Sequence, residues 1–335
     1  IAGFIHAHPD EIVFTSGGTE ANNIAIMGTI EAIRRAGVDY KDIHILGSAI
    51  EHSSVRECFV ELKRRGVEVE EVKVDSRGGV LVDDLEKKIR ANTVLISVMM
   101  VNNETGVVQP IREVSRILRH SKNEKKPLFH TDVSQAVYQE LNVEKLGIDL
   151  LTLDASKMYG PSGTGALFVR RNTPIEPIIF GGGQENGLRS GTENLPGVMG
   201  FAKAVELLAN ELKKEVSRLA ELKRFFTEEL MKIRPDAKLN GEGADASPHI
   251  ANISIPGIDN EFFVLQLDAK GVACSTKSSC LRDEGDSYVL RVMGADGNSS
   301  VRFSFGRWTT RREIKRTIRI LRQCGTTRRI PRLSP

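Results

Sequence analysis

The sequence predicts an α/β protein: a large domain on a mostly parallel β-sheet with helices on both faces, then a smaller C-terminal α+β domain. Short β-branched runs alternate with longer helical stretches, which is the order of βαβ units. Several of these runs are apolar almost throughout, as strands are when both faces of a sheet are covered. A long stripe of apolar residues then leads into the second domain.

The predicted strands of the large domain are rich in β-branched and apolar residues. They cover residues 11–17, 42–49, 67–74, 93–103, 127–133 and 149–155. Segments of mixed polarity, such as ANNIAIMGTIEAIRRAG and LVDDLEKKIRA, lie between them and predict the crossover helices.

A long amphipathic helix, or two helices joined end to end, is predicted from residue 205 to just before Pro235. Apolar residues recur there every three or four positions, at Leu208, Leu212, Val216, Leu219, Leu222, Phe226, Leu230 and Ile233. We expect the domain boundary inside this helix, which gives domains 1–212 and 213–335. The smaller domain is expected to contain a strand at 249–255 and a helix at 261–271.

The composition bounds the class of protein. A hydrophobic content of 40% with 27% charged residues is ordinary for a soluble globular protein, and a net charge of +3 requires no nucleic-acid partner. No apolar run is as long as a membrane span, and the first residues lack a signal-peptide pattern. The cysteines are widely scattered without metal-ligand spacing, at Cys58, Cys274, Cys280 and Cys324. This usage predicts a reducing compartment such as the cytoplasm, and no metal site.

Residues whose side chains can take part in catalysis or ligand binding follow five of the predicted strands. Ligands of α/β sheets gather at the carboxyl ends of the strands, so we expect these residues to lie together. In chain order they are the helix-opening block SGGTEANN at 16–23, His52, Asn102 with Asn103 and Glu104, Asp132 with Gln135, and Asp154 with Ser156 and Lys157. Taken singly, the glycine block also fits a plain helix cap, and His52 fits a structural histidine.

Lys157 stands between an apolar run and a glycine-rich turn, where most lysines are surface residues. The residues that follow the other strands favour a functional lysine instead, because together with Lys157 they suit the binding of pyridoxal phosphate. A lysine amine forms the Schiff base, a carboxylate keeps the pyridine nitrogen protonated, a flat ring stacks on the cofactor, and a helix N-terminus accepts the phosphate. We therefore favour Lys157 as the Schiff-base lysine.

Eight blocks distributed along the chain carry a family resemblance. They are SGGTEANN, EHSS, VNNETGVVQP, TDVSQA, SKMYGPSGTGALFVRR, GGGQENGLRSGTEN, VACSTKSSC and VRFSFGRWTT. In this order they resemble the NifS/IscS family of cysteine desulfurases over nearly the whole chain. The resemblance implies the type I pyridoxal-phosphate fold and a homodimer.

The resemblance also implies roles around the cofactor ring. Lys157 would form the Schiff base, Asp132 would pair with the pyridine nitrogen, and His52 would stack on the ring. The two amides Asn103 and Gln135 would approach the ring oxygen.

Further roles concern the phosphate and the substrate. Gly18 and Thr19 would hold the phosphate, and Thr192 would reach it from the partner subunit. Arg302 would bind the substrate carboxylate, together with Asn103, because its planar guanidinium suits that group.

The nucleophile implied by the resemblance is Cys280, in a loop of small residues from Ser275 that is similar to STGSAC. Cys274, six residues earlier, is not the nucleophile. The implied reaction converts L-cysteine to L-alanine and leaves a persulfide on Cys280 for iron–sulfur clusters or thiolated cofactors. A sulfur-acceptor or scaffold protein is the implied partner, with only a transient contact of Cys280 with a cluster during transfer.

This chain departs from the family pattern at several positions. Asp154 and Ser156 stand where the family carries serine and histidine, and the cysteine loop has Lys277 and Ser279 in place of glycine and alanine. A carboxylate would repel the phosphate, so we expect Asp154 to turn away and Ser156, Thr19 and backbone amides to carry the phosphate. The chain also lacks the family's N-terminal portion, which includes a DNAATT-like strand.

Two other functions fit the same residues. One is a selenocysteine lyase, and the other is a catalytically weakened paralogue that acts as an assembly partner. The segment 306–335 has ten basic residues against one acid, Glu313. It is either a solvated helix face or a docking surface for an acidic partner.

Overall fold

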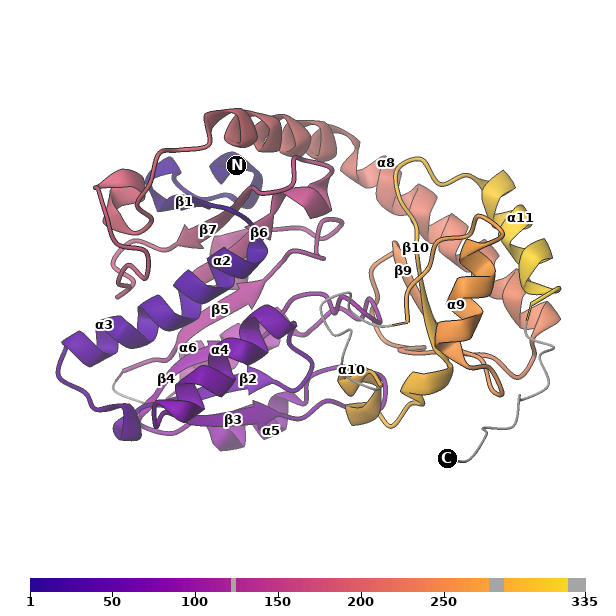
Figure 1. Cartoon of the computed structure of the whole chain (residues 1–335). Helices are drawn as coiled ribbons and strands as arrows, with labels where there is room; N and C mark the ends of the chain where they lie inside the picture. The colour runs from indigo at the N-terminus through magenta and orange to yellow at the C-terminus, as the bar shows by residue number, and fades with distance from the viewer. Residues whose placement is uncertain (122–124, 277–285, 325–335) are drawn as a thin grey trace, which may run out of the picture. The chain divides into compact units, whose positions relative to one another are not determined.

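A computed structural model describes residues 1–121, 125–276 and 286–324 (Figure 1). The chain divides into two compact units. The large unit comprises residues 1–75, 79–102 and 108–212. The small unit comprises residues 76–78, 103–107 and the chain from residue 213 onward.

A seven-stranded sheet forms the centre of the large unit. Its strands are β1 (Ile12–Thr15), β2 (His44–Ser48), β3 (Glu68–Val72), β4 (Thr93–Ser97), β5 (Leu128–Asp132), β6 (Leu150–Asp154) and β7 (Gly165–Val169). Their spatial order is β1-β7-β6-β5-β4-β2-β3. All five residues of β2 are buried, so both faces of the sheet are covered at that strand. The six strands expected in this part of the chain are confirmed.

One strand runs against the others. β2, β3, β4, β5 and β6 pair in parallel, whereas β7 pairs antiparallel with both β6 and β1. The sheet is therefore mixed, and β7 was not among the expected strands. Because β7 separates β1 from β6, β1 still points the same way as the parallel strands. The carboxyl ends of six strands consequently share one edge of the sheet.

Helices α2 (Gly18–Asn23), α3 (Thr29–Arg35) and α4 (Ser53–Arg64) lie in front of the sheet in Figure 1. A π-helical turn, Ile24–Gly28, joins α2 to α3. Buried apolar residues of these helices form one core cluster with Ile45, Leu95, Leu150 and Leu167 of the strands. The remaining helices of this unit are α1 (Ala2–Ile5), α5 (Val82–Lys88), α6 (Ile111–His120) and α7 (Val143–Leu146).

The long helix α8 (Leu195–Ile233) runs from the large unit into the small one. It is one continuous helix, and it begins ten residues before the periodic stripe. Gly197 and Gly200 weakened the sequence signal in that first part. These glycines allow close packing, since an added Cβ would lie 2.4 Å from Thr164 Oγ1 at Gly197 and 3.0 Å from Pro161 Cγ at Gly200.

The small unit contains an antiparallel three-stranded sheet in the order β10-β9-β8. Its elements are β8 (Lys238–Leu239), β9 (Ile250–Ser254), α9 (Asn260–Asp268), α10 (Tyr288–Val292), β10 (Ser300–Ser304) and α11 (Arg311–Leu321). β9 and α9 confirm the expected strand and helix. The ring of Phe226 in α8 packs 4.8 Å from that of Phe303 and 5.5 Å from that of Phe305, centroid to centroid.

Within the described ranges, no helix is both long and apolar enough to span a membrane. In the same ranges, no three His, Cys, Asp or Glu side chains are grouped so that they could hold a metal ion.

Candidate functional site

Lys157 follows the carboxyl end of β6 directly. It lies in a short 3-10 helix, Ala155–Met158, which ends at Tyr159 in a left-handed conformation with φ of 62°. The turn is closed by a hydrogen bond of 2.8 Å from the Gly160 amide to the Ala155 carbonyl. The Lys157 side chain is exposed, so its amine is accessible.

Asp132 is the last residue of β5, and only 6% of it is exposed. Its Oδ1 accepts a hydrogen bond of 2.8 Å from the Ser134 amide. Its Oδ2 accepts one of 2.8 Å from Asn22 Nδ2 in α2. A buried carboxylate needs such partners, and these two contacts fix its orientation.

A hydrogen-bond chain connects Asp132 with His52. Asn22 Nδ2 also donates to Ser54 Oγ at 2.8 Å, and Ser54 Oγ lies 2.8 Å from His52 Nδ1. His52 is the N-cap of α4, and its Nδ1 accepts from the Ser54 amide at 3.2 Å. An accepting Nδ1 leaves the proton of the neutral ring on Nε2.

The charges of this cluster act on His52 together. Burial lowers the pKa of His52 below its usual value, Asp132 and Asp154 oppose this effect, and Lys157 adds to it. The structure thus brings His52, Asp132, Asp154 and Lys157 to one edge of the sheet. This confirms the expectation that residues following separate strands gather there.

Two members of this network, Asn22 and Ser54, were not among the predicted site residues. Both lie in blocks that carry the family resemblance, SGGTEANN and EHSS. Their positions in those blocks were the available signal. Their role depends on the packing of α2, α4 and β5 against one another, which no local sequence pattern predicts.

Two further buried acid–base groups lie beneath the same edge. Glu51 is fully buried, and burial raises the pKa of its carboxyl to about 8, against hydrogen bonds from Ser48 Oγ and the Met99 amide. His130 in β5 is fully buried as well, and burial lowers its pKa to about 4. At pH 7 the uncharged form of each group therefore predominates.

Gly17 lies in the turn between β1 and α2, and Gly18 directly after it is the first residue of α2; together they are called the glycine turn. Gly17 has a φ of 147°, a conformation that favours glycine. The turn packs on Gly165 of β7, where an added Cβ would lie 2.7 Å from Gly17 Cα. Gly165 is also the register partner of Asp154, so the Gly18 amide lies next to the end of β6.

Asp154 accepts hydrogen bonds both from the glycine turn and from Ser156. Its Oδ2 accepts from the Gly18 amide at 3.1 Å, and its Oδ1 accepts from the Ser156 amide at 2.9 Å and from Ser156 Oγ at 2.6 Å. The expectation that its carboxylate turns away from a bound phosphate stays a prediction, since these contacts are those of the protein without the phosphate. The amides of Gly18 and Ser156 thus donate to a side chain of the protein itself, because they lie within reach of the adjacent carboxylate.

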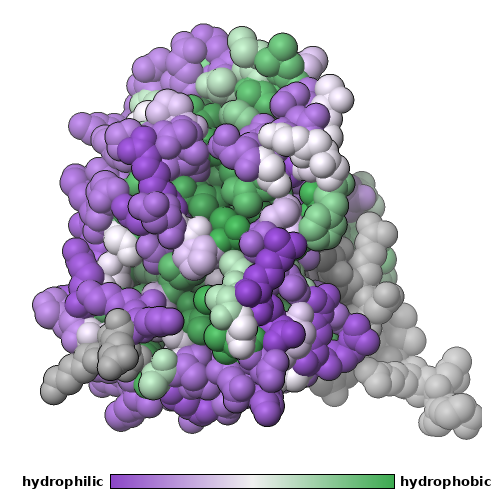
Figure 2. Space-filling view, turned by 90° about the vertical axis from the view of Figure 1, so that its left-hand side faces the viewer, coloured by the Kyte–Doolittle hydropathy of each residue, from purple (hydrophilic) through white to green (hydrophobic). Residues whose placement is uncertain are grey.

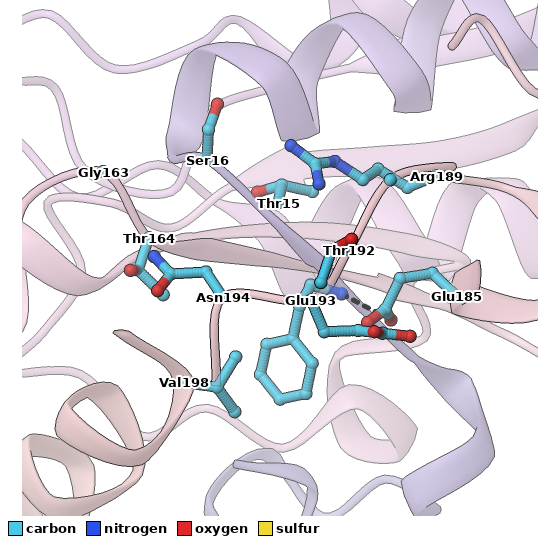
Figure 3. A pocket seen from close by; sticks show the side chains of 12 residues that line it. Thr15, Ser16, Gly163, Thr164, Glu185, Arg189, Thr192, Glu193, Asn194 and Val198 are labelled. Carbon is cyan, nitrogen blue, oxygen red and sulfur yellow. Dashed lines mark hydrogen bonds between the residues drawn. The ribbon is translucent and has the colours of Figure 1, made fainter. Parts of the chain in front are cut away.

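The other predicted residues of the large unit occupy different parts of this region. Thr19 is exposed in the first turn of α2, and Gln135 is half-buried in the turn after β5. Thr192 lines a pocket of this unit together with Ser16, Thr164 and Arg189 (Figure 3). The role of Thr192 towards a partner subunit stays a prediction.

Arg302 and Asn103 both belong to the small unit. Arg302 Nη1 donates to the Asn103 carbonyl at 2.7 Å. The backbone of Arg302 in β10 pairs with Ser275 through hydrogen bonds of 2.7 and 3.1 Å, so the first residue of the cysteine loop is attached beside Arg302. Arg302 Nε and Asn103 Oδ1 are buried without a hydrogen-bond partner among the described residues.

The predicted nucleophile, Cys280, lies outside the described residues, as do Lys277 and Ser279. Cys274 is described, and burial raises the pKa of its thiol to about 12. A thiol with that pKa is a poor nucleophile at neutral pH.

Comparison with known proteins identifies the family. A family model described as aminotransferase class-V matches residues 1–317. The chain belongs to this class-V aminotransferase family. A cysteine desulfurase IscS of Dictyoglomus turgidum is 42% identical over 326 residues, which cover 96% of this chain and 80% of that protein. A cysteine desulfurase of Homo sapiens is 38% identical over 325 residues, which cover 95% of this chain and 69% of that protein.

A solved structure described as a NifS-like protein shares the fold of this class-V aminotransferase. The two superpose with a TM-score of 0.88 at 32% sequence identity, over 96% of this chain and 84% of that one. The expected type I pyridoxal-phosphate fold is thereby confirmed.

Class-V aminotransferases depend on pyridoxal phosphate. The residues of this chain fit the cofactor's ring: Lys157 offers an accessible amine, and Asp132 offers a buried, oriented carboxylate that suits a protonated ring nitrogen. The role of Asn103, which belongs to the small unit, stays a prediction. Donors for a phosphate are present at Gly18 and Ser156, where Asp154 engages them.

Proposed function

We propose that this class-V aminotransferase is a cysteine desulfurase, which converts L-cysteine to L-alanine and transfers the sulfur to Cys280. The observation that carries the proposal is the grouping of Lys157, Asp132 and His52 at one sheet edge, with Asn22 and Ser54 linking the last two. Relatives at 38–42% identity that are named cysteine desulfurases support the same reaction.

Bound pyridoxal phosphate would supply an electron sink for the substrate's α-carbon. Lys157 would remove the proton from that carbon and return it, because its amine is the accessible base at the end of β6. Asp132 would hold a proton on the ring nitrogen of the cofactor. Arg302 would bind the substrate carboxylate through the guanidinium face that includes its unsatisfied Nε.

The sulfur transfer balances without another reactant. The Cys280 thiolate attacks the substrate sulfur, an S–S bond forms, and the C–S bond to the substrate's β-carbon breaks. Protonation at the carbon gives alanine, so L-cysteine and one thiol yield L-alanine and one persulfide. No oxidant is consumed.

The test is an absorption spectrum of the purified protein before and after L-cysteine is added. We expect the visible band of a Schiff base on Lys157, its fixation by borohydride, and alanine formed from cysteine. Lys157→Ala should lose all three signals. Lys203→Ala, at an exposed lysine paired with Glu206 in α8, is the control and should keep them. A Lys157→Ala variant with normal turnover would rule the proposal out.

A homodimer is part of the proposal. Figure 2 shows one face of the molecule on which hydrophobic residues form a band bordered by hydrophilic ones. Large apolar side chains of the large unit are exposed, among them Phe180 (75%), Leu195 (63%) and Met199 (63%). Light scattering on the eluting protein tests this point, and a monomer at micromolar concentration would contradict it.

The acceptor is proposed to be an acidic sulfur-acceptor or scaffold protein that docks on α11. Ile314, Ile318 and Leu321 are buried, whereas the basic side chains of this helix are exposed, at Arg311, Arg312, Lys315, Arg316 and Arg319. Glu313 is occupied in a capping box with Thr310. Reversing the charge at Lys315 and Arg319 should slow persulfide transfer to such a protein and leave alanine formation unchanged.

We place the protein in the cytoplasm or another reducing compartment. The described cysteines Cys58, Cys274 and Cys324 are all free thiols. A persulfide-forming thiol also needs reducing surroundings to remain available. Mass spectrometry of the native protein would contradict this placement if it found stable disulfides.

A further inference from the structure

The carboxylate of Asp154 occupies the donors that a phosphate at this turn would use. Gly18 donates its amide at 3.1 Å, and Ser156 donates its amide at 2.9 Å and its hydroxyl at 2.6 Å. Both carboxylate oxygens are therefore engaged. The Asp154 carboxylate therefore accepts the hydrogen bonds that a bound anion would otherwise accept from this turn.

The Asp154 carboxylate and the Ser134 hydroxyl lie close against the glycine turn. A Cβ added at Gly18 would lie 3.3 Å from Asp154 Oδ2 and 3.1 Å from Ser134 Oγ. A Cβ added at Gly17 would lie 3.6 Å from the same Oδ2. The Asp154 oxygen thus stands directly over the glycine turn, in the space that the absence of side chains at Gly17 and Gly18 opens.

The charge at this position is not neutralised by a neighbouring cation. In the described part of the chain, Asp154 forms no ion pair with Lys or Arg within 4.0 Å. Arg189, which lines the neighbouring pocket, is paired with Glu20 at 2.8 Å. A phosphate carries close to two negative charges near neutral pH. At this turn it would find its hydrogen-bond donors already occupied, and the negative charge of Asp154 would repel it.

We propose that Asp154 is a built-in competitor of the cofactor's phosphate, and that this phosphate binds only when the Asp154 side chain leaves Gly18 and Ser156. The inference rests on the proposed function, since it assumes that the site takes pyridoxal phosphate. Asp154 is then a specificity-determining residue, because it reduces the affinity for pyridoxal phosphate relative to the affinity for pyridoxal, which lacks the phosphate. It also stabilises the cofactor-free protein, because the turn keeps its hydrogen bonds.

The test compares two ligands on the cofactor-free protein. Pyridoxal phosphate and pyridoxal are titrated by absorbance into the wild type, Asp154→Asn and Asp154→Ser. Asparagine keeps the size and one acceptor oxygen without the charge, and serine also vacates the space. We expect both variants to bind pyridoxal phosphate at least about tenfold more tightly, a factor that corresponds to ~1.4 kcal/mol. Their affinity for pyridoxal should stay within about twofold of the wild type, a factor well below that tenfold change.

Two controls separate this inference from its alternatives. Asp10→Asn removes one negative charge from the large unit at an exposed pair with Arg171, and it should change neither affinity. A thermal melt of each cofactor-free variant reports folding, and inorganic phosphate should raise the melting temperature of Asp154→Ser more than that of the wild type.

The outcomes are distinct. Equal or weaker binding of pyridoxal phosphate by the folded variants would overturn the competitor role, and it would show that Asp154 supports the cofactor instead. Failure of the wild type and all variants to form a borohydride-reducible linkage with either ligand would refute the proposed function itself.

Discussion

Asn22 and Asp132, which are 110 positions apart in the sequence, share a buried hydrogen bond of 2.8 Å from Nδ2 to Oδ2. The same amide nitrogen also donates to Ser54 Oγ at 2.8 Å. One side chain of α2 therefore orients the carboxylate at the end of β5 and, through Ser54, the imidazole at the start of α4. The cofactor-ring part of the site depends on this amide.

Replacing Asn22 with alanine should damage this network. Asp132 Oδ2 would lose its side-chain donor inside the protein, and we expect a loss of about 1–3 kcal/mol in the free energy of unfolding. Cofactor affinity should fall as well, because Asp132 and His52 lose their common partner. Urea unfolding and cofactor absorbance measure the two effects. The neighbouring Asn23→Ala, which removes a single exposed bond to the Thr19 carbonyl, is the control, and equal effects of both changes would contradict the prediction.

The stability of the protein should depend on pH through Glu51. Burial raises the pKa of this carboxyl to about 8, whereas the unfolded chain ionises near 4.3, as an ordinary glutamate does. Between these values the folded protein holds one proton more than the unfolded chain. The contribution of Glu51 to stability is therefore full below the unfolded pKa, and it is lost as the pH rises towards the folded one.

Glu51→Gln should remove this slope, which amounts to about 1.4 kcal/mol per pH unit for one proton. Urea unfolding at several pH values in that window measures it. Glu86→Gln, at an exposed carboxylate of α5, should leave the slope intact. An unchanged slope in Glu51→Gln would show that Glu51 ionises in the folded protein.

The cysteines should differ in reactivity. Burial raises the pKa of both Cys58 and Cys274 to about 12, so only about one molecule in 10⁵ carries either thiolate at pH 7. After L-cysteine is added, mass spectrometry should find the extra sulfur on Cys280. Cys280→Ser should keep the cofactor's spectral response and lose the persulfide, whereas Cys274→Ser should change little. Sulfur from labelled cysteine on Cys274 would refute the assignment.

Gly165 should be intolerant of a side chain. An added Cβ would lie 2.7 Å from both Gly17 Cα and the Leu153 carbonyl oxygen, and none of these backbone atoms can move independently. We expect Gly165→Ala to cost about 1–3 kcal/mol of stability and to weaken cofactor binding by displacing the glycine turn. Gly183→Ala has open space and a φ of −86°, so it should behave as the wild type. Normal stability of Gly165→Ala would mean that the turn is not held by this contact.

Much of this protein could be predicted from local patterns. Apolar periodicity indicated six strands of the large sheet, and the residues directly after those strands indicated the site. β7 was not among these six strands, and its direction was not predictable either, because a short apolar strand has the same pattern in either orientation. The sequence also did not predict that residues 76–78 and 103–107 belong to the small unit, since both are short segments within the part of the chain that forms the large unit.

The sequence by itself determined which chemical groups reach the edge of the sheet, because chain order and strand periodicity place Asp132, Lys157 and His52 at strand ends. Only the tertiary structure decided which groups satisfy one another there. Asp154 finds the Gly18 amide across 136 positions, and Asn22 finds both Asp132 and Ser54. The physical reason is that a side chain's orientation follows from the donors and charges around it in space, and these come from segments that no local pattern connects.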